Sequence, residues 1–362
     1  MLYRPAEDAT ALQRFGDLTP ALACQNLIPL LIIFMAYGAF AREREQGTLQ
    51  QLMSLGVRPS ALLPGKTAGI SCAFLPILLP ASFVSILAIA WLTPAELLAD
   101  EITRLALFML SYAIYFGVFL FLSLGVSARC RSSASALAIM LSFWALTTLV
   151  APHALSDLAR NLYPTASSIE LKHGLEESTR IAEARSWEQT SAALLSQYQV
   201  EKTGDLPFAF EGAALQADEE STYSLFEKHY EEFFTALHAQ NDLHQLGALI
   251  SPLAGVQLVS MALTGNDLQH HRDFILQAEA HRRVIHTMIN DYIVRNSTKT
   301  ADGQWRSEAG RELWERIPDF VYVPANWRSA VSNCAVGLGL LGIWFVVAVA
   351  GAFGAVARIK IL

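Results

Sequence analysis

Two long runs of the sequence contain no charged residue, and they constrain the fold more than any other feature. No Asp, Glu, Lys or Arg occurs in Leu22–Ala41 or in Thr67–Ala95. A helix of about 20 residues crosses a hydrocarbon core that is roughly 30 Å thick. Within that core every backbone polar group must be bonded inside the protein, which favours helices. The sequence therefore predicts an all-α membrane protein.

Further apolar windows bring the expected number of transmembrane helices to about five. The windows are Leu22–Phe40, Thr67–Leu92, Leu105–Ser127, Ser132–Pro152 and Ala330–Ala357. Charged residues make up 16% of the chain, against about 25% in soluble domains. Most of them lie between His153 and Arg328, and the net charge is −7. No basic footprint for nucleic acid is present, so nucleic acid is excluded as a partner.

A sixth apolar window, Leu246–Gly265, also lacks charged residues. It contains Pro252 and several polar residues, and it runs directly into a strongly polar helical pattern. A span at this place would also put the basic residues after the last window on the opposite side of the membrane from the other basic loops. We therefore interpret this window as a buried or membrane-surface segment.

The basic residues of the short connections set the expected orientation. Lys and Arg are concentrated on the cytoplasmic side of membrane proteins. Three connections are basic, and the connection between the second and third windows is acidic; the basic residues are Arg42, Arg44, Arg58, Lys66, Arg129, Arg131, Arg358 and Lys360. The three basic connections are therefore expected in the cytoplasm, and the protein is expected in a bacterial inner membrane.

This orientation divides the chain into four parts. Residues 1–20 are an extracytoplasmic segment, and residues 21–152 hold four spans with a cytoplasmic loop at residues 42–66. Residues 153–328 form an extracytoplasmic domain inserted before the last span. Apolar residues recur there every three to four positions in 167–198, 211–245 and 266–294, so this domain is expected to be helical. Residues 329–362 are the last span and a cytoplasmic tail.

Catalytic and nucleotide-binding motifs are not evident in the sequence. Gly65-Lys66-Thr67 resembles the end of a phosphate-binding loop, but Ser60 stands where the pattern requires a glycine. The predicted spans carry no ionisable residue in mid-membrane, which argues against an ion-coupled transporter. We therefore expect a transporter that is not itself an enzyme, has no cofactor of its own and is powered by another chain.

A metal site is a weaker alternative. Asp267 lies three and four residues before His270 and His271, so these side chains share a helical face. A zinc site needs further ligands in a set geometry, and no pattern such as HExxH supplies them. Surface or core-edge histidines explain the same residues, but a membrane-bound metal hydrolase remains a possible reading.

The cytoplasmic loop itself is unusually organised. Its residues Arg42–Ser54, followed by Val57-Arg58-Pro59 and Gly65-Lys66, resemble the first cytoplasmic loop of type-2 ABC exporter permeases. With the flanking spans, the resemblance covers about residues 20–152. It implies a loop that couples the permease to an ATPase through Arg42, Glu43, Arg44, Glu45, Gly47, Thr48, Leu49, Leu52, Met53, Arg58 and Pro59. The segment from Ser251 to Asn290 is similar, more loosely, to a subgroup with large extracytoplasmic insertions.

The resemblance implies an exporter permease that pairs with a second permease subunit and docks a separate ATP-binding subunit. ATP and Mg²⁺ then bind to that partner. Thr48 is expected to cap a short helix whose apolar stripe for a partner contains Leu49, Leu52, Met53 and Leu55. Glu43 and Glu45 are expected to pair with Arg42 and Arg44 or with basic groups of the ATPase.

Two alternatives stay open at this point. Permeases of this type have six spans, and the sequence shows five, so the first is expected to be missing from it. A membrane-anchored sensory or binding protein with a helical outer domain would show the same spans. The loop helix would then be a simple amphipathic helix at the membrane surface.

Overall fold

The computed structural model describes residues 20–165, 168–301, 305–307 and 310–359. Helices make up 82% of it, which confirms the predicted helical class. One short antiparallel ladder, which the sequence did not predict, pairs β1 (Thr298–Lys299) with β2 (Trp305–Arg306). Apart from Pro20, the expected N-terminal segment 1–20 lies outside the described residues.

The chain divides into two compact units. Unit 1 contains the described residues up to Leu158, the stretch Asp242–Asp267 and the described residues from Ala325 onward. Unit 2 contains Ala159–Asn241 and Leu268–Pro324. The region 153–328, expected as a single domain, is therefore interrupted in its middle by a stretch that packs in unit 1.

Within the part of the chain that the structure describes, four helical stretches are long and apolar enough to cross a membrane, and a bent helix raises the number to five. Each of the five overlaps one of the predicted windows. They are Ala23–Glu45, the bent pair Ala61–Pro76 and Leu78–Leu92, Leu98–Arg129, Ser133–Leu162 and Ala335–Ala357. The elements that form them are η1 (Ala23–Leu27), α3 (Ile28–Ala36), α4 (Ala41–Glu45), α6 (Pro59–Leu92), α7 (Leu98–Arg129), α8 (Ser133–Ala145), η2 (Leu146–Val150), α9 (Ala151–Leu162) and α16 (Ala335–Ala357).

Helix α6 bends by 50° between Pro76 and Leu78. Pro80 has no N–H to donate to the carbonyl of Pro76, four residues earlier, and its ring pushes that carbonyl aside. The bend therefore follows from the proline spacing in the sequence.

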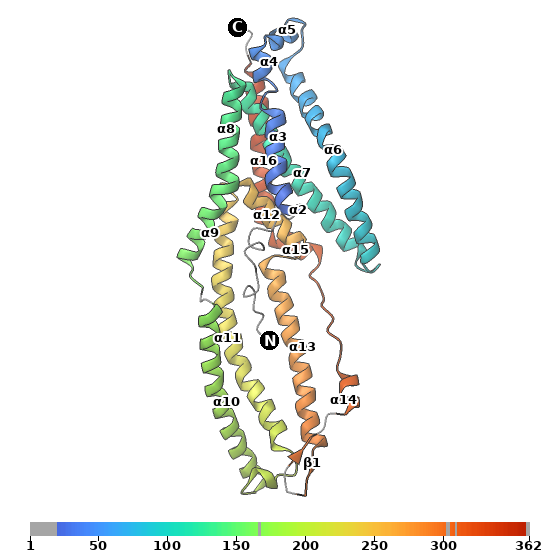
Figure 1. The fold of residues 1–362 in the computed structure, drawn as a ribbon, viewed down its shortest axis with the longest axis vertical. Coiled ribbons are helices and arrows are strands. Elements are labelled where there is room, and N and C mark those ends of the chain that lie inside the picture. The colour runs from blue at the N-terminus through green and yellow to red at the C-terminus, as the bar shows by residue number, and fades with distance from the viewer. Residues whose placement is uncertain (1–19, 166–167, 302–304, 308–309, 360–362) are drawn as a thin grey trace. The chain divides into compact units, whose positions relative to one another are not determined.

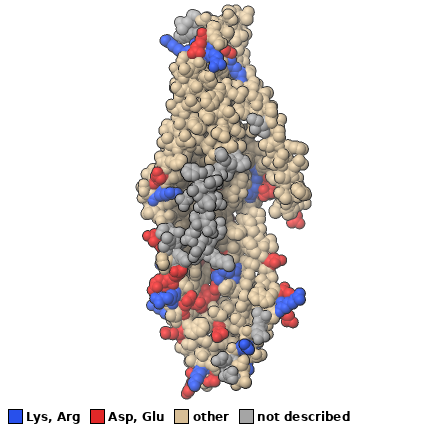
Figure 2. Space-filling model, viewed as in Figure 1, with Lys and Arg blue, Asp and Glu red and all other residues tan. Residues whose placement is uncertain are grey.

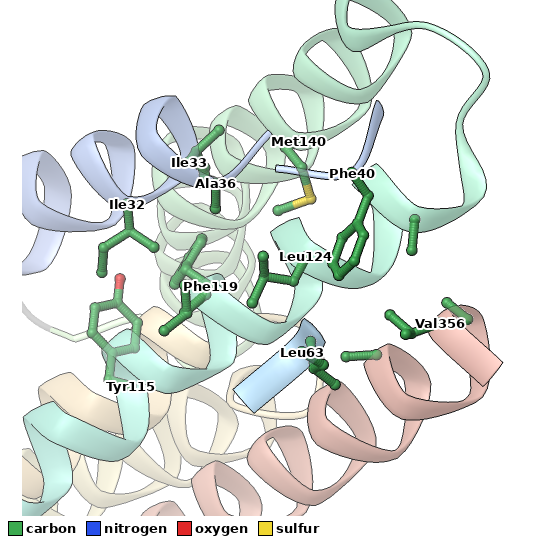
Figure 3. Close-up of a cluster of buried hydrophobic side chains, with 14 of the residues drawn as sticks. Ile32, Ile33, Ala36, Phe40, Leu63, Tyr115, Phe119, Leu124, Met140 and Val356 are labelled. Atoms are coloured by element: carbon green, nitrogen blue, oxygen red, sulfur yellow. The ribbon is translucent and has the colours of Figure 1, made fainter. Parts of the chain in front are cut away.

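Helix α7 forms the centre of unit 1, where it contacts α3, α6, α8 and α16 (Figure 1). Its side chains Phe119 and Leu124 are fully buried, together with Ile33 of α3 (Figure 3). Gly125 allows a close approach to α16, since a Cβ there would lie 3.2 Å from the Cα of Ala352. Small residues of this kind let apolar helices pack tightly in membranes.

The sixth apolar window folds as the short helix α12 (Pro252–Leu263) in unit 1. Its first turn is capped by Ser251, whose side-chain oxygen accepts a hydrogen bond from the N–H of Ala254. Its twelve residues are too few to cross a membrane. Val256 and Val259 are fully buried, and α12 packs on α7 and α16. The prediction of a buried segment instead of a span is confirmed.

Unit 2 contains three long helices, and they match the three predicted helical stretches. Its helices are α10 (Ser168–Tyr198), most of α11 (Phe210–Gly247), α13 (Leu268–Asn296) and the short α14 (Arg311–Arg316). Arg282 of α13 donates hydrogen bonds to Glu279 of the same helix at 2.8 Å and to Glu219 of α11. His286 Nδ1 lies 3.3 Å from the second carboxylate oxygen of Glu219. The acidic and basic residues of this region thus link its helices.

Candidate functional site

The loop between the first two spans folds into two short helices, α4 and α5 (Thr48–Ser54), near one end of unit 1 (Figure 1). Gly47 is the N-cap of α5 and has a φ of 74°, a left-handed conformation that glycine adopts without strain. The expectation that Thr48 caps this helix is therefore wrong. Thr48 is the first helical residue, and its hydroxyl donates to the carbonyl of Glu43 at 3.2 Å.

Helix α4 is fixed to the end of α7 and the start of α8. The guanidinium of Arg44 donates to the carbonyl of Ala128 at 2.7 Å and to that of Cys130, both at the carboxyl end of α7. Glu45 accepts hydrogen bonds from the backbone N–H and the hydroxyl of Ser133, both at 2.9 Å. A cation at a helix C-terminus and an anion at a helix N-terminus both complement the helix dipole.

A second anchor joins α4 to α6. The ammonium of Lys66 lies 2.6 Å from Glu43 Oε1 and donates to the carbonyl of Ala39 at 2.6 Å. It also lies 5.0 Å from the ring centre of Phe40, a favourable cation–π distance. Glu43 and Glu45 are thus occupied by Lys66 and α8, and not by the neighbouring Arg42 and Arg44 as expected.

The predicted apolar stripe of α5 is turned largely inward. Leu49 is 2% exposed and belongs to the same buried cluster as Leu63, which Figure 3 shows among the core residues. Met53 is partly buried against this cluster, and Leu52 is half-buried. Leu55, directly after α5, is 80% exposed. Leu55 is therefore the apolar side chain of this loop that faces solvent, whereas Leu49 anchors α5 to the core.

The surface that remains open at this end is polar and basic. Its exposed residues are Arg42, Glu45, Gln46, Gln50, Gln51, Ser54, Leu55, Gly56, Arg58, Arg129, Arg131 and Arg358. Arg42 donates to the hydroxyl of Tyr37 at 3.0 Å, while Pro59 is the first residue of α6. Figure 2 shows charged side chains gathered at the end that carries α4 and α5, and few along the apolar helices. We call these exposed residues the loop surface.

The arrangement around Asp267, His270 and His271 gives no geometry for a metal centre. His270 is 4% exposed, whereas His271 points to solvent. Among the described residues, no group of three or more His, Cys, Asp or Glu side chains is placed to hold a metal ion.

Sequence reasoning missed a buried polar network between η1, α7 and α12. The amide of Gln25 donates to the hydroxyl of Tyr112 at 3.0 Å and accepts from the amide of Gln257 at 3.2 Å. The hydroxyl of Tyr115 donates to the carbonyl of Gln25 at 2.7 Å, and Tyr112 reaches Ser260 at 3.4 Å. The adjacent polar residues Gln25 and Asn26, inside an otherwise apolar run, are the sequence signal that could have indicated this network.

Arg104, in the acidic connection between the second and third predicted windows, is also buried, at 5% exposure. It donates to Asp100 Oδ2 at 2.9 Å, to the carbonyl of Leu263 at 3.4 Å and to the carbonyl of Ala325. Asp100 Oδ1 accepts from the N–H of Trp327 at 2.9 Å. This ion pair therefore ties the start of α7 to the end of α12 and to the chain just before α15 (Trp327–Asn333).

A family model for a domain of unknown function, DUF3526, matches residues 168–323. No curated protein and no solved structure matches the chain. The matched region contains most of unit 2 together with the stretch Asp242–Asp267 of unit 1, and it begins after the fourth span. The comparison thus marks residues 168–323 as similar to the DUF3526 domain, while the loop surface and the spans lie largely outside the match.

Proposed function

We propose that this protein is the permease subunit of an ATP-driven exporter and that the loop surface docks a separate ATP-binding subunit. ATP hydrolysis on that partner would then drive transport across a bacterial inner membrane. The loop lies in the cytoplasm in this proposal, and unit 2 lies on the opposite side. A second permease subunit completes the transporter.

The observation that carries the proposal is the attachment of α4 to three of the long apolar helices. Arg44 and Glu45 hold α4 to α7 and α8, and Glu43 holds it to Lys66 of α6. Helix α5 is tied to α4 by the Thr48 hydroxyl and to the core by Leu49, so a force on α5 would reach these helices through α4, whose contacts are charge-assisted hydrogen bonds. A loop that merely joined two spans would not need these contacts.

Leu55 is the residue on which the docking test depends. It is 80% exposed and follows α5 directly, so replacing it leaves the buried cluster around Leu49 intact. Leu55→Glu in the full chain, coexpressed with an ABC-type ATP-binding subunit that copurifies with the wild type, should abolish copurification of that subunit. A buried apolar anchor at the centre of an interface commonly contributes about 2 kcal/mol or more, roughly a thirtyfold loss of affinity.

Trp314→Glu is the matched control, because Trp314 is an exposed apolar residue of unit 2 at 58% exposure. This variant should copurify with the ATP-binding subunit as the wild type does. Retention of the ATP-binding subunit by Leu55→Glu would refute the docking surface. If the wild type itself fails to bind such a subunit, the membrane-anchored binding protein becomes the better explanation of the fold.

A further inference from the structure

Two of the spans contain a π-helical turn, in which the N–H of residue i bonds to the carbonyl of residue i−5. These turns are η1 and η2, where Ile28 N–H bonds to the Ala23 carbonyl and Ala151 N–H bonds to the Leu146 carbonyl. A π-turn widens the helix, disturbs the regular backbone bonds, and recurs at functional sites. Each of these turns therefore calls for a specific explanation.

Side chains of neighbouring helices bond carbonyls in or beside both π-turns. Trp144 of α8 donates to the carbonyl of Asn26 at 3.2 Å, and Tyr115 of α7 bonds that of Gln25. Ser251, before α12, donates to the carbonyl of Thr147 at 2.6 Å. Carbonyl groups of both π-turns thus accept hydrogen bonds from side chains of other segments. These contacts hold the two turns in place.

Two side-chain atoms of the π-turns are nevertheless buried without a hydrogen-bond partner among the described residues: Asn26 Oδ1 in η1 and Thr148 Oγ1 in η2. Thr148 is only 5% exposed. The hydroxyl of its neighbour Thr147, by contrast, donates to the carbonyl of Phe143 at 2.8 Å. A buried polar atom without a hydrogen-bond partner costs about 1–3 kcal/mol. The burial of both Asn26 Oδ1 and Thr148 Oγ1 without partners therefore needs an explanation.

The two atoms lie on helices that face each other. Trp144 contacts η1 through Asn26, and Thr148 follows Trp144 by four residues, about one turn along the same side of the span. No Asp, Glu, Lys or Arg occurs in Pro20–Ala36, Ser133–Val150 or Pro252–Leu263. Helix α7 also borders this place, and its buried Arg104 is already paired with Asp100. A charged ligand would therefore be buried without a counter-charge, at a cost of several kcal/mol.

We propose that Asn26 and Thr148 bind an uncharged hydroxyl or amide group of a lipid-soluble transported molecule within the membrane. Asn26 Oδ1 accepts a hydrogen bond from that group, and the Thr148 hydroxyl donates or accepts a second one. The surrounding apolar helices then accommodate the rest of the molecule. This assignment of substrate class rests on the proposed transport function, although the binding test does not require the ATP-binding subunit.

The test measures thermal unfolding of the full chain in phosphatidylcholine nanodiscs that contain one of three probes. Dioleoylglycerol offers a hydroxyl, ceramide offers an amide and hydroxyls, and dioleoyl phosphatidic acid offers a charged phosphate on the same acyl chains. Dioleoylglycerol, ceramide or both should raise the unfolding temperature, and the responding probe identifies the preferred group. Phosphatidic acid should leave it unchanged. No response to either neutral probe, or an equal response to phosphatidic acid, overturns the proposal.

Thr148→Val and Asn26→Leu should each weaken binding of the responding probe about tenfold, the value of one hydrogen bond. Without a probe, Thr148→Val should unfold at the wild-type temperature or above it, because the substitution removes an unpartnered buried hydroxyl. Thr147→Val is the control and should bind the probe as the wild type does. A lower unfolding temperature of Thr148→Val without probe would show that the hydroxyl only supports the fold.

The two proposals fail separately. If the neutral probes do not bind while Leu55→Glu still releases the ATP-binding subunit, the substrate class is wrong and the permease assignment stands. If a neutral probe binds through Asn26 and Thr148 but no ATP-binding subunit copurifies, the site is real and belongs to a lipid-binding membrane protein.

Discussion

Replacing Arg104 by methionine is expected to loosen the place where α7, α12 and the chain before α15 meet. Methionine keeps most of the apolar length of the arginine side chain, so the change removes the charge and its hydrogen bonds more than the packing. Asp100 and the carbonyls of Leu263 and Ala325 then lose their donor. Asp100 also holds the N–H of Trp327, so the disturbance extends to α15.

The size of the effect follows from burial. Breaking a buried ion pair by removing one partner costs about 3–5 kcal/mol. The Arg104 side chain is 6% exposed and that of Asp100 is 24% exposed, so we take the lower end, about 3 kcal/mol. If the wild-type pair opposes local opening by this energy, its loss should speed the exchange of nearby backbone amides with solvent. Amides around Arg104 and Trp327 should then exchange up to about a hundredfold faster in the variant than in the wild type.

Hydrogen exchange of the full chain in nanodiscs, read by mass spectrometry, measures this prediction. Arg104→Met should raise exchange in peptides that contain Trp327, and Arg104→Lys should lie between it and the wild type because an ammonium makes fewer directed bonds. Arg180→Met is the control, since Arg180 is 74% exposed in its pair with Glu177, and it should leave exchange around Trp327 at the wild-type rate. Unchanged exchange around Trp327 in Arg104→Met would refute the reasoning.

Two further predictions concern the packing of unit 1 and the charges of unit 2. Gly125→Leu should destabilise the protein by about 1–3 kcal/mol, because the new leucine side chain would meet the backbone of α16. Gly351→Leu is the control and should not destabilise it, because the space around Gly351 is open. Unfolding of both variants in detergent measures the difference. Burial and then Glu183 raise the pKa of Asp218, so its ionisation destabilises the fold as pH rises through that pKa. Asp218→Asn should therefore unfold at a higher temperature than the wild type at pH 7.5, and the gain should vanish in acid; a pH-independent difference would contradict this.

The loop between the first two spans shows where reading the sequence succeeded and where it stopped. The charged island and its short helix are visible in the sequence, because both are local features. The partners of Glu43, Arg44 and Glu45 lie on α6, α7 and α8, in part more than 80 residues away, and charge spacing within the island does not reveal them. The capping role shifted from Thr48 to Gly47 because a tight reversal between α4 and α5 requires a left-handed residue.

The buried polar residues show the same limit. The sequence neighbours of Arg104 include the acidic Asp100 and Glu101, and they do not show that the Arg104 side chain is buried. Gln25, Asn26 and Thr148 are polar residues in apolar windows, and the windows do not show their partners. Which of them bonds, and which remains without a partner, depends on the rotation and spacing of helices that are distant in sequence.

The sequence by itself determined that the chain is helical and which windows are apolar enough to cross a membrane. These features follow from local hydropathy and helical periodicity. The tertiary structure alone decided that α12 lies among the long apolar helices, that Leu49 faces inward while Leu55 faces outward, and that each of the two π-turns holds a polar side-chain atom without a partner. Each of these depends on long-range packing, because the same local pattern fits several helix rotations until neighbouring helices select one.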